Sequence, residues 1–240
     1  MSIKKKIHLN GFVQNSPSPH STGLWKHEKD EGIRHNRLEY WTETAKVLER
    51  GKFDAVFIAD VLGTYSVYGN SHDVAVRHAV QLPAHDPLLI ISAMAQVTEH
   101  IGFAPTVSAT YAQPYALARQ LSTLDHLTEG RLAWNVVTSY LESEAVNLGL
   151  SGRIPKNQRY DRADEFLEVV YKLWEHSWED DAVVHDREAD TFALPEKVHA
   201  INHHGEFFNV PGIHLTEPSP QRTPVLFQAG ASPRGRDFAA

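Results

Sequence analysis

The sequence contains no cysteine among its 240 residues. This absence excludes disulfide bonds, zinc sites built on thiolates and catalysis by a thiol nucleophile. It also fits a protein that works in a reducing compartment. Hydrophobic residues make up 42% of the chain and charged residues 22%, which is the balance of a globular protein with a buried core and not of a disordered chain.

Positive charge and long apolar runs are also scarce. Lys and Arg number 23 against 30 Asp and Glu, which gives a net charge of −7. Nucleic acids and anionic membranes attract clustered Lys and Arg, so neither is expected as a main partner. No apolar run approaches the roughly 18 residues of a membrane span, and no apolar signal region follows Lys4–Lys6. We therefore expect a cytoplasmic protein without a membrane segment.

Short apolar runs alternate with patterns typical of amphipathic helices. Strands are expected at residues 7–13, 54–60, 102–107, 131–137 and 224–229. Helices are expected at residues 38–51, 86–98, 114–127 and 160–174, and one more begins near residue 233. Such alternation predicts five β/α units with parallel strands. Residues 176–222 break the rhythm, and we interpret them as an inserted excursion.

Five β/α units leave two architectures open, a doubly wound sheet or part of an eight-stranded barrel. No Gly-x-Gly-x-x-Gly motif follows the first expected strand, so the dinucleotide-binding fingerprint is missing. The sequence stops just as a helix begins, which favours the N-terminal part of a longer barrel.

The carboxyl ends of the expected strands carry mostly neutral hydrogen-bonding groups. In parallel α/β folds chemistry gathers at these ends. The polar or small residues there are Asn10, Asp60, Thr106, Ser108, Asn135, Thr138, Ser139, Gly230, Ala231 and Ser232. This set suits a polar planar ring better than a hydrolytic metal centre. The small residues 229–232 at a helix start would let backbone N–H groups approach a phosphate, although each residue alone could simply cap a helix.

At these positions the sequence resembles the nitrilotriacetate monooxygenase group of the bacterial-luciferase-like flavin-dependent monooxygenases. The resemblance runs through essentially the whole chain and lies in residues 54–60, 105–110, 130–139, 159–166 and 227–232. It implies a two-component oxidoreductase that uses reduced FMN and O2 to oxidise a small organic substrate, such as an aminopolycarboxylate or an organosulfur compound. It also implies a separate NAD(P)H:flavin reductase as partner, and a homo-oligomer.

The resemblance implies a (β/α)8 TIM barrel of the bacterial-luciferase-like type. Members of the family are longer than this chain, so residues 1–240 are expected to form a single partial barrel domain. This barrel would be truncated after strand five and would carry the insertion 176–222 before that strand. Because an incomplete barrel excludes water poorly, we expect the chain to bind flavin weakly and to have little activity.

The resemblance also assigns roles to individual residues. The cofactor-binding set is Asp60, Thr106 and Asn135 at the flavin ring, with Lys156, Tyr160, Ala231 and Ser232 at the phosphate. Lys156 stands where the family often has histidine, and it would neutralise a phosphate as a point charge. Trp25 and His27 match a family segment near the substrate, and we expect them to be catalytic residues.

Two other functions stay open at this point. Fifteen histidines raise the possibility of a metal-dependent hydrolase on an α/β barrel. His199 and His203 are four residues apart and His72 and His78 six apart, but no His-Glu-x-x-His motif is present. We therefore expect no metal site. The other alternative is a non-catalytic truncated barrel, whose exposed sheet edge would favour aggregation.

Overall fold

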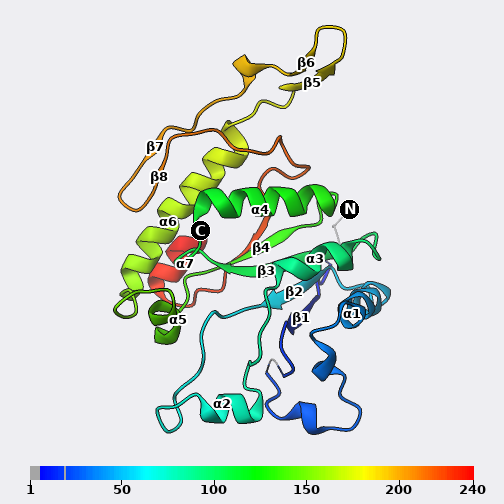
Figure 1. Cartoon of the computed structure of the whole chain (residues 1–240), viewed down its shortest axis with the longest axis vertical. Helices are drawn as coiled ribbons and strands as arrows, with labels where there is room; N and C mark the ends of the chain where they lie inside the picture. The colour runs from blue at the N-terminus through cyan, green and yellow to red at the C-terminus, as the bar shows by residue number, and fades with distance from the viewer. Residues whose placement is uncertain (1–5, 19) are drawn as a thin grey trace. The chain divides into compact units, whose positions relative to one another are not determined.

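The structure, a computed structural model, describes residues 6–18 and 20–240 (Figure 1). Its strands are β1 (Asn10–Gln14), β2 (Ala55–Ala59), β3 (Gly102–Ser108), β4 (Ala133–Val137), β5 (Val183–Asp186), β6 (Thr191–Ala193), β7 (His203–His204), β8 (Asn209–Val210) and β9 (Val225–Phe227). Its α-helices are α1 (Leu38–Arg50), α2 (Asp73–His78), α3 (Leu88–Ala95), α4 (Pro114–Leu127), α5 (Glu142–Asn147), α6 (Lys156–Tyr171) and α7 (Pro233–Ala239). The residues Lys4 and Lys5, on which the expectation about a signal segment depends, lie outside the described residues.

Five strands form the main sheet in the order β1-β2-β3-β4-β9. The β1–β2 and β2–β3 pairs are parallel, with Asn10 opposite Ala55 and Ala55 opposite Gly102. The five strands of this sheet thus lie side by side in the same order as they occur along the chain. A barrel has this order, whereas a doubly wound sheet reverses direction partway. No helix of the described residues is long and apolar enough to cross a membrane.

The chain forms two compact units. Unit 1 consists of the described residues up to Thr106 with residues 133–135 and 141–153. Unit 2 consists of residues 107–132, 136–140 and 154–240. Fully buried side chains of unit 1 include Trp41, Val56, Ile58, Ile91, Met94 and Phe103. Those of unit 2 include Leu117, Leu121, Phe166, Val169, Val170 and Leu173.

The helix ends show where local sequence signals act. Helix α4 has the bounds that the sequence predicts, with Pro114 in its first turn. Asp86 stands before Pro87 at the start of α3, and its carboxylate accepts the Leu88 N–H at 2.8 Å. A glycine after a periodic apolar pattern is typical of a helix C-cap, and α1 does end at Arg50 with Gly51 as its C-cap. The left-handed conformation falls one residue later, at Lys52, with φ of 60°. Helices α2 and α5, of six residues each, are too short for a periodic pattern to reveal them.

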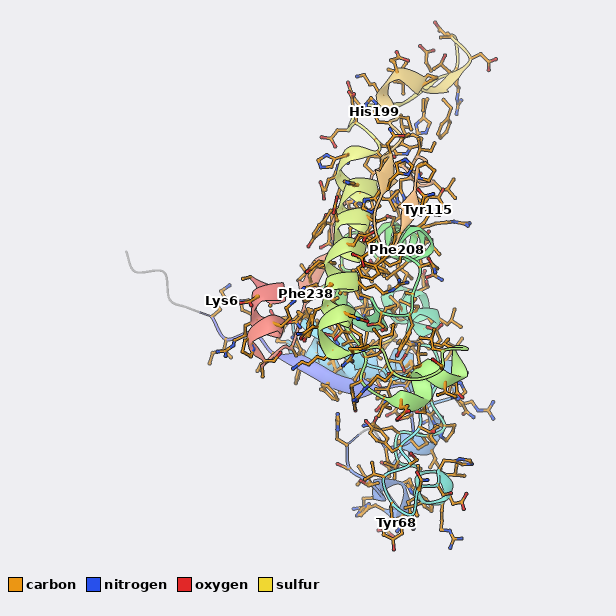
Figure 2. All side chains as sticks on the ribbon, turned by 90° about the vertical axis from the view of Figure 1, so that its left-hand side faces the viewer. Lys6, Tyr68, Tyr115, His199, Phe208 and Phe238 are labelled. Atoms are coloured by element: carbon orange, nitrogen blue, oxygen red, sulfur yellow. The ribbon has the colours of Figure 1, made fainter. Side chains whose placement is uncertain are left out.

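Residues 176–222 contain two small antiparallel sheets, β5–β6 and β7–β8 (Figure 1). The second is fastened to α6 through Glu165, which accepts the Phe207 and Phe208 N–H groups at 2.9 and 2.8 Å. Phe208 lies beside α6 in Figure 2, with the Arg162 guanidinium 4.3 Å from its ring centre. The charges of residues 161–165 suggest a solvated helix face, but Arg162 and Glu165 instead hold this hairpin.

Glu49 of α1 stabilises the turn that leads into β3. Its carboxylate accepts the backbone N–H groups of Glu99, His100 and Ile101 at 2.9, 2.7 and 3.1 Å. Partial burial alone would raise the pKa of Glu49, but these three hydrogen bonds outweigh burial and hold the pKa below its ordinary value of 4.5. A lowered pKa means that the ionised carboxylate stabilises the folded state.

We predict that Glu49→Ala lowers the free energy of unfolding by about 1 kcal/mol at neutral pH, since the site is partly exposed. This stabilisation is fully present above the unfolded pKa of about 4.5 and is lost as the pH falls through the lower folded pKa. Urea unfolding of wild type and variant at pH 7 and pH 3 measures both effects. An equal difference in unfolding free energy at the two pH values would contradict the role of the charge.

Candidate active site

Three of the residues assigned to the flavin ring come from the carboxyl side of neighbouring strands in unit 1. Asp60 directly follows β2, Thr106 lies in β3 and Asn135 lies in β4. The Asn135 Nδ2 group donates a hydrogen bond to Thr106 Oγ1 at 2.8 Å, and the two residues are 7% and 4% exposed. The structure therefore brings this predicted pair together in a buried polar contact.

Asp60 has an electrostatic environment unlike that of a surface carboxylate. Its pKa is raised to about 6, mainly by burial and to a smaller extent by the nearby carboxylates of Asp86 and Glu144, while the Val61 N–H acts in the opposite direction. A carboxyl group with such a pKa exists in both protonation states near neutral pH. It can therefore donate or accept a hydrogen bond, which is a common property of functional groups.

Tyr160 and the turn before α7 lie together in unit 2. Tyr160 is 7% exposed, and its ring meets the edge of Phe238, which Figure 2 shows on α7 beside α6. A Cβ atom added at Gly235 would lie 2.7 Å from Tyr160 Oη and 3.0 Å from Gly230 Cα. Ser232 caps the helix, since its Oγ accepts the Gly235 N–H at 3.1 Å. The tyrosine hydroxyl thus faces a turn in which glycine is the residue that fits.

Four predicted site residues are more exposed. Lys156 is the first residue of α6 and is exposed, as is Ala231. Trp25 Nε1 donates to the His78 carbonyl at 3.2 Å, and His27 Nδ1 accepts the Lys29 N–H at 3.2 Å. Within residues 6–18 and 20–240, no hydrogen bond or ring contact joins Trp25 or His27 to the predicted ring-binding residues. Their catalytic role stays a prediction.

Two arginines of α6 reach the strand ends of unit 2, which the sequence did not reveal. Arg159 is buried and donates from Nη1 to the Thr138 carbonyl at 3.0 Å. Arg162 donates from Nε to the Thr110 carbonyl, also at 3.0 Å. In the same region Ser139 Oγ donates to Ser108 Oγ at 2.8 Å. Arg159 and Arg162 are three residues apart, a spacing that places both side chains on the same face of α6. Their charge, however, is typical of a helix face that is exposed to solvent.

The histidines that raised the possibility of a metal site have other partners. His199 Nε2 lies 2.9 Å from Glu179 Oε1, and His203 Nε2 lies 3.1 Å from Glu165 Oε1. In the part of the chain that the structure describes, no three His, Asp or Glu side chains gather to hold a metal ion.

Comparison with known proteins places these features in context. The sequence profile of the luciferase-like monooxygenase family matches residues 10–240. The chain is 58% identical over 238 residues to long-chain alkane monooxygenase of Geobacillus thermodenitrificans (strain NG80-2), covering 99% of this chain and 54% of that protein. It is 57% identical to dimethyl-sulfide monooxygenase of Hyphomicrobium sulfonivorans, over 99% of this chain and 50% of the relative. Nitrilotriacetate monooxygenase component A of Aminobacter aminovorans is 40% identical, and the match covers 100% of this chain and 53% of that protein.

Solved structures agree with the sequence matches. The crystal structure of a long-chain alkane monooxygenase superposes with a TM-score of 0.97 at 58% identity, covering 99% of this chain and 55% of the other. The crystal structure of a riboflavin lyase with modified FMN and riboflavin superposes with a TM-score of 0.92 at 38% identity, covering 98% and 52%. The chain thus spans about half the length of the curated relatives it matches.

Proposed function

The chain belongs to the luciferase-like monooxygenase family, and from this premise we propose that it acts as a flavin-dependent monooxygenase. It takes reduced FMN and O2 and oxidises a small organic substrate. The observation that carries this proposal is the glycine turn against Tyr160, which is built in a way that suits a phosphate-bearing cofactor. The named activities of the similar proteins, all monooxygenases, support the same reaction class.

For unit 2, we propose that Tyr160, Ala231 and Ser232 hold the FMN phosphate, with Lys156 supplying positive charge. The turn at Gly230 and Gly235 has no room for side chains, so backbone N–H groups can approach an anion closely. The Tyr160 hydroxyl and the Ser232 hydroxyl are both hydrogen-bond donors suited to phosphate oxygens. The residues present therefore fit the phosphate end of FMN.

For unit 1, we propose that Asp60, Thr106 and Asn135 contact the flavin ring. Asn135 uses one amide hydrogen on Thr106, which leaves its carbonyl oxygen and second hydrogen for a ligand. Asp60 can donate or accept near neutral pH because of its raised pKa. These atoms match a ring with both N–H and C=O groups on its edge. When bound, reduced flavin supplies the electrons that activate O2, and the protein supplies orientation and exclusion of water.

Several further features of the whole enzyme belong to the proposal. A separate reductase supplies the reduced FMN, in line with a relative whose name makes it component A of an enzyme. The protein is cytoplasmic and forms a homo-oligomer, and Trp25 and His27 face the substrate.

The main sheet is the N-terminal part of an eight-stranded barrel with residues 176–222 as an insertion, since the chain covers 55% of the alkane monooxygenase structure. In that case flavin binding by these 240 residues is weak.

We predict that Gly235→Ala weakens binding of reduced FMN at least tenfold but leaves binding of reduced riboflavin unchanged. The new Cβ would displace the Tyr160 hydroxyl, and riboflavin has no phosphate for this hydroxyl to hold. Anaerobic fluorescence titration with both flavins measures the difference. Gly212→Ala is the matched control, because a Cβ there meets no atom within 4 Å. An equal loss of affinity for both flavins would contradict the proposal that the FMN phosphate binds at this turn.

A further inference from the structure

Side chains at the start of α5 hydrogen-bond to the main chain of the loop that follows Asp60. Glu144 Oε1 accepts the Leu62 N–H at 2.9 Å, and Glu144 Oε2 accepts the Leu141 N–H at 3.2 Å. Ser143 Oγ accepts the Thr64 N–H at 3.0 Å and donates to the Thr64 carbonyl at 2.9 Å. Two side chains about 80 residues away in the sequence thus fix the main chain of the loop on both sides of Gly63.

The fit between loop and helix start is close. A Cβ at Gly63 would lie 2.6 Å from Ser143 Oγ and 2.7 Å from Glu144 Cγ. Glycine is therefore needed here for space, so that the backbone can approach both side chains. Glu144 is 2% exposed, and a buried carboxylate that accepts backbone N–H groups forms strong, directional contacts.

The loop of residues 61–64, which Ser143 and Glu144 hold, directly follows Asp60. Val61 is bonded to Asp60 on one side and to Leu62 on the other, and its N–H lowers the pKa of the Asp60 carboxyl group. The hydrogen bonds at Leu62 and Thr64 therefore restrain the main chain directly after Asp60. The charged groups that act on Asp60 are Asp86, before α3, and Glu144, on α5; both raise its pKa, whereas the Val61 N–H lowers it.

We propose that Ser143 and Glu144 are positioning residues, which hold the loop 61–64 and thereby fix the direction of the Asp60 carboxyl group. The role of Asp60 toward flavin rests on the proposed function, but the positioning itself does not. Ser143 and Glu144 act through the loop main chain and need no contact with the cofactor. The two can therefore be tested in the protein without flavin.

The test combines amide hydrogen exchange of Leu62 and Thr64 with a carbon-13 NMR pH titration of the Asp60 carboxyl carbon. Ser143→Ala is expected to speed exchange at Thr64 about tenfold, because the Thr64 N–H loses its acceptor and the Thr64 carbonyl loses its donor. It is also expected to raise the Asp60 midpoint above the wild-type value, because the Val61 N–H no longer holds the ionised carboxylate. Glu144→Gln is expected to speed exchange at Leu62 by a similar factor.

Asp86→Asn is the matched control. It removes a negative charge near Asp60 without touching the loop, so the Asp60 midpoint should fall while exchange at Leu62 and Thr64 stays at the wild-type rate. Unchanged exchange in both Ser143→Ala and Glu144→Gln would overturn the proposal. Faster exchange with an unmoved Asp60 midpoint in Ser143→Ala would overturn it as well.

A reduced-FMN titration of Ser143→Ala separates this proposal from the proposed function. Weaker binding, together with the exchange and midpoint changes, supports both. Unchanged binding alongside those changes leaves the positioning role in place and removes Asp60 from the flavin site. Thermal melts of each variant confirm that the comparison is made between folded proteins.

Discussion

Trp41→Ala is expected to lower the free energy of unfolding by about 3–5 kcal/mol, the usual cost of emptying a buried tryptophan site. Trp41 is 1% exposed in α1, and its Nε1 donates to the His35 carbonyl at 2.7 Å. Alanine would leave both a cavity and a buried carbonyl without its donor. Equilibrium unfolding in urea, followed by far-ultraviolet circular dichroism, measures the loss.

The matched control is Trp41→Phe, which keeps an aromatic ring in α1 but removes the donor to His35. Its cost should be smaller than that of alanine, and the difference between the two variants reports the packing contribution. A loss below about 1 kcal/mol for alanine would contradict the burial of this side chain, since surface substitutions have effects of that size.

Asp60→Ala is expected to weaken binding of reduced FMN by about 1.5–3 kcal/mol, or roughly ten- to 150-fold, the range for hydrogen bonds to charged groups. Asp60 follows β2 in a half-buried position, and its pKa is raised to about 6. Reduced riboflavin should lose affinity to the same extent, because Asp60 is assigned to the ring and not to the phosphate. Anaerobic titration with both flavins measures this.

Asp60→Asn is the isosteric control, because it keeps a donor and an acceptor but cannot ionise. We expect it to retain more affinity than the alanine variant. Wild-type affinity in a normally melting Asp60→Ala protein would exclude Asp60 from the site. Weaker binding of FMN with unchanged riboflavin would instead place Asp60 near the phosphate.

Much of the fold could be predicted because its signals are local. The apolar run before Asp60 and the leucine spacing after Pro114 predict β2 and α4, and the family suggested by residues 130–139 and 159–166 is confirmed over residues 10–240. The same signals are less exact at the ends of helices. Gly51 caps α1, but the left-handed residue is Lys52, and α6 begins at Lys156, four residues before the predicted start.

The candidate site was predictable in part for the same reason. Residues at strand ends are visible in the sequence, so Thr106 and Asn135 could each be named as candidate site residues, whereas the hydrogen bond between them is seen only in the structure. The residues that support them could not, because Glu144 meets Leu62 across 82 positions of sequence. Nothing in the local pattern around Arg159 distinguishes a buried arginine from a solvated one. Such contacts depend on which distant segments of the chain lie next to each other in the fold, and hydrophobic periodicity does not specify this.

The central claim is that this chain binds reduced FMN, and an anaerobic titration with reduced FMN, paired with a thermal melt on the same sample, tests it most directly. We expect saturable binding, weak in absolute terms, and a melting temperature that rises with flavin concentration. A protein that melts cooperatively, but shows neither saturable binding nor a shifted melting temperature, would contradict it.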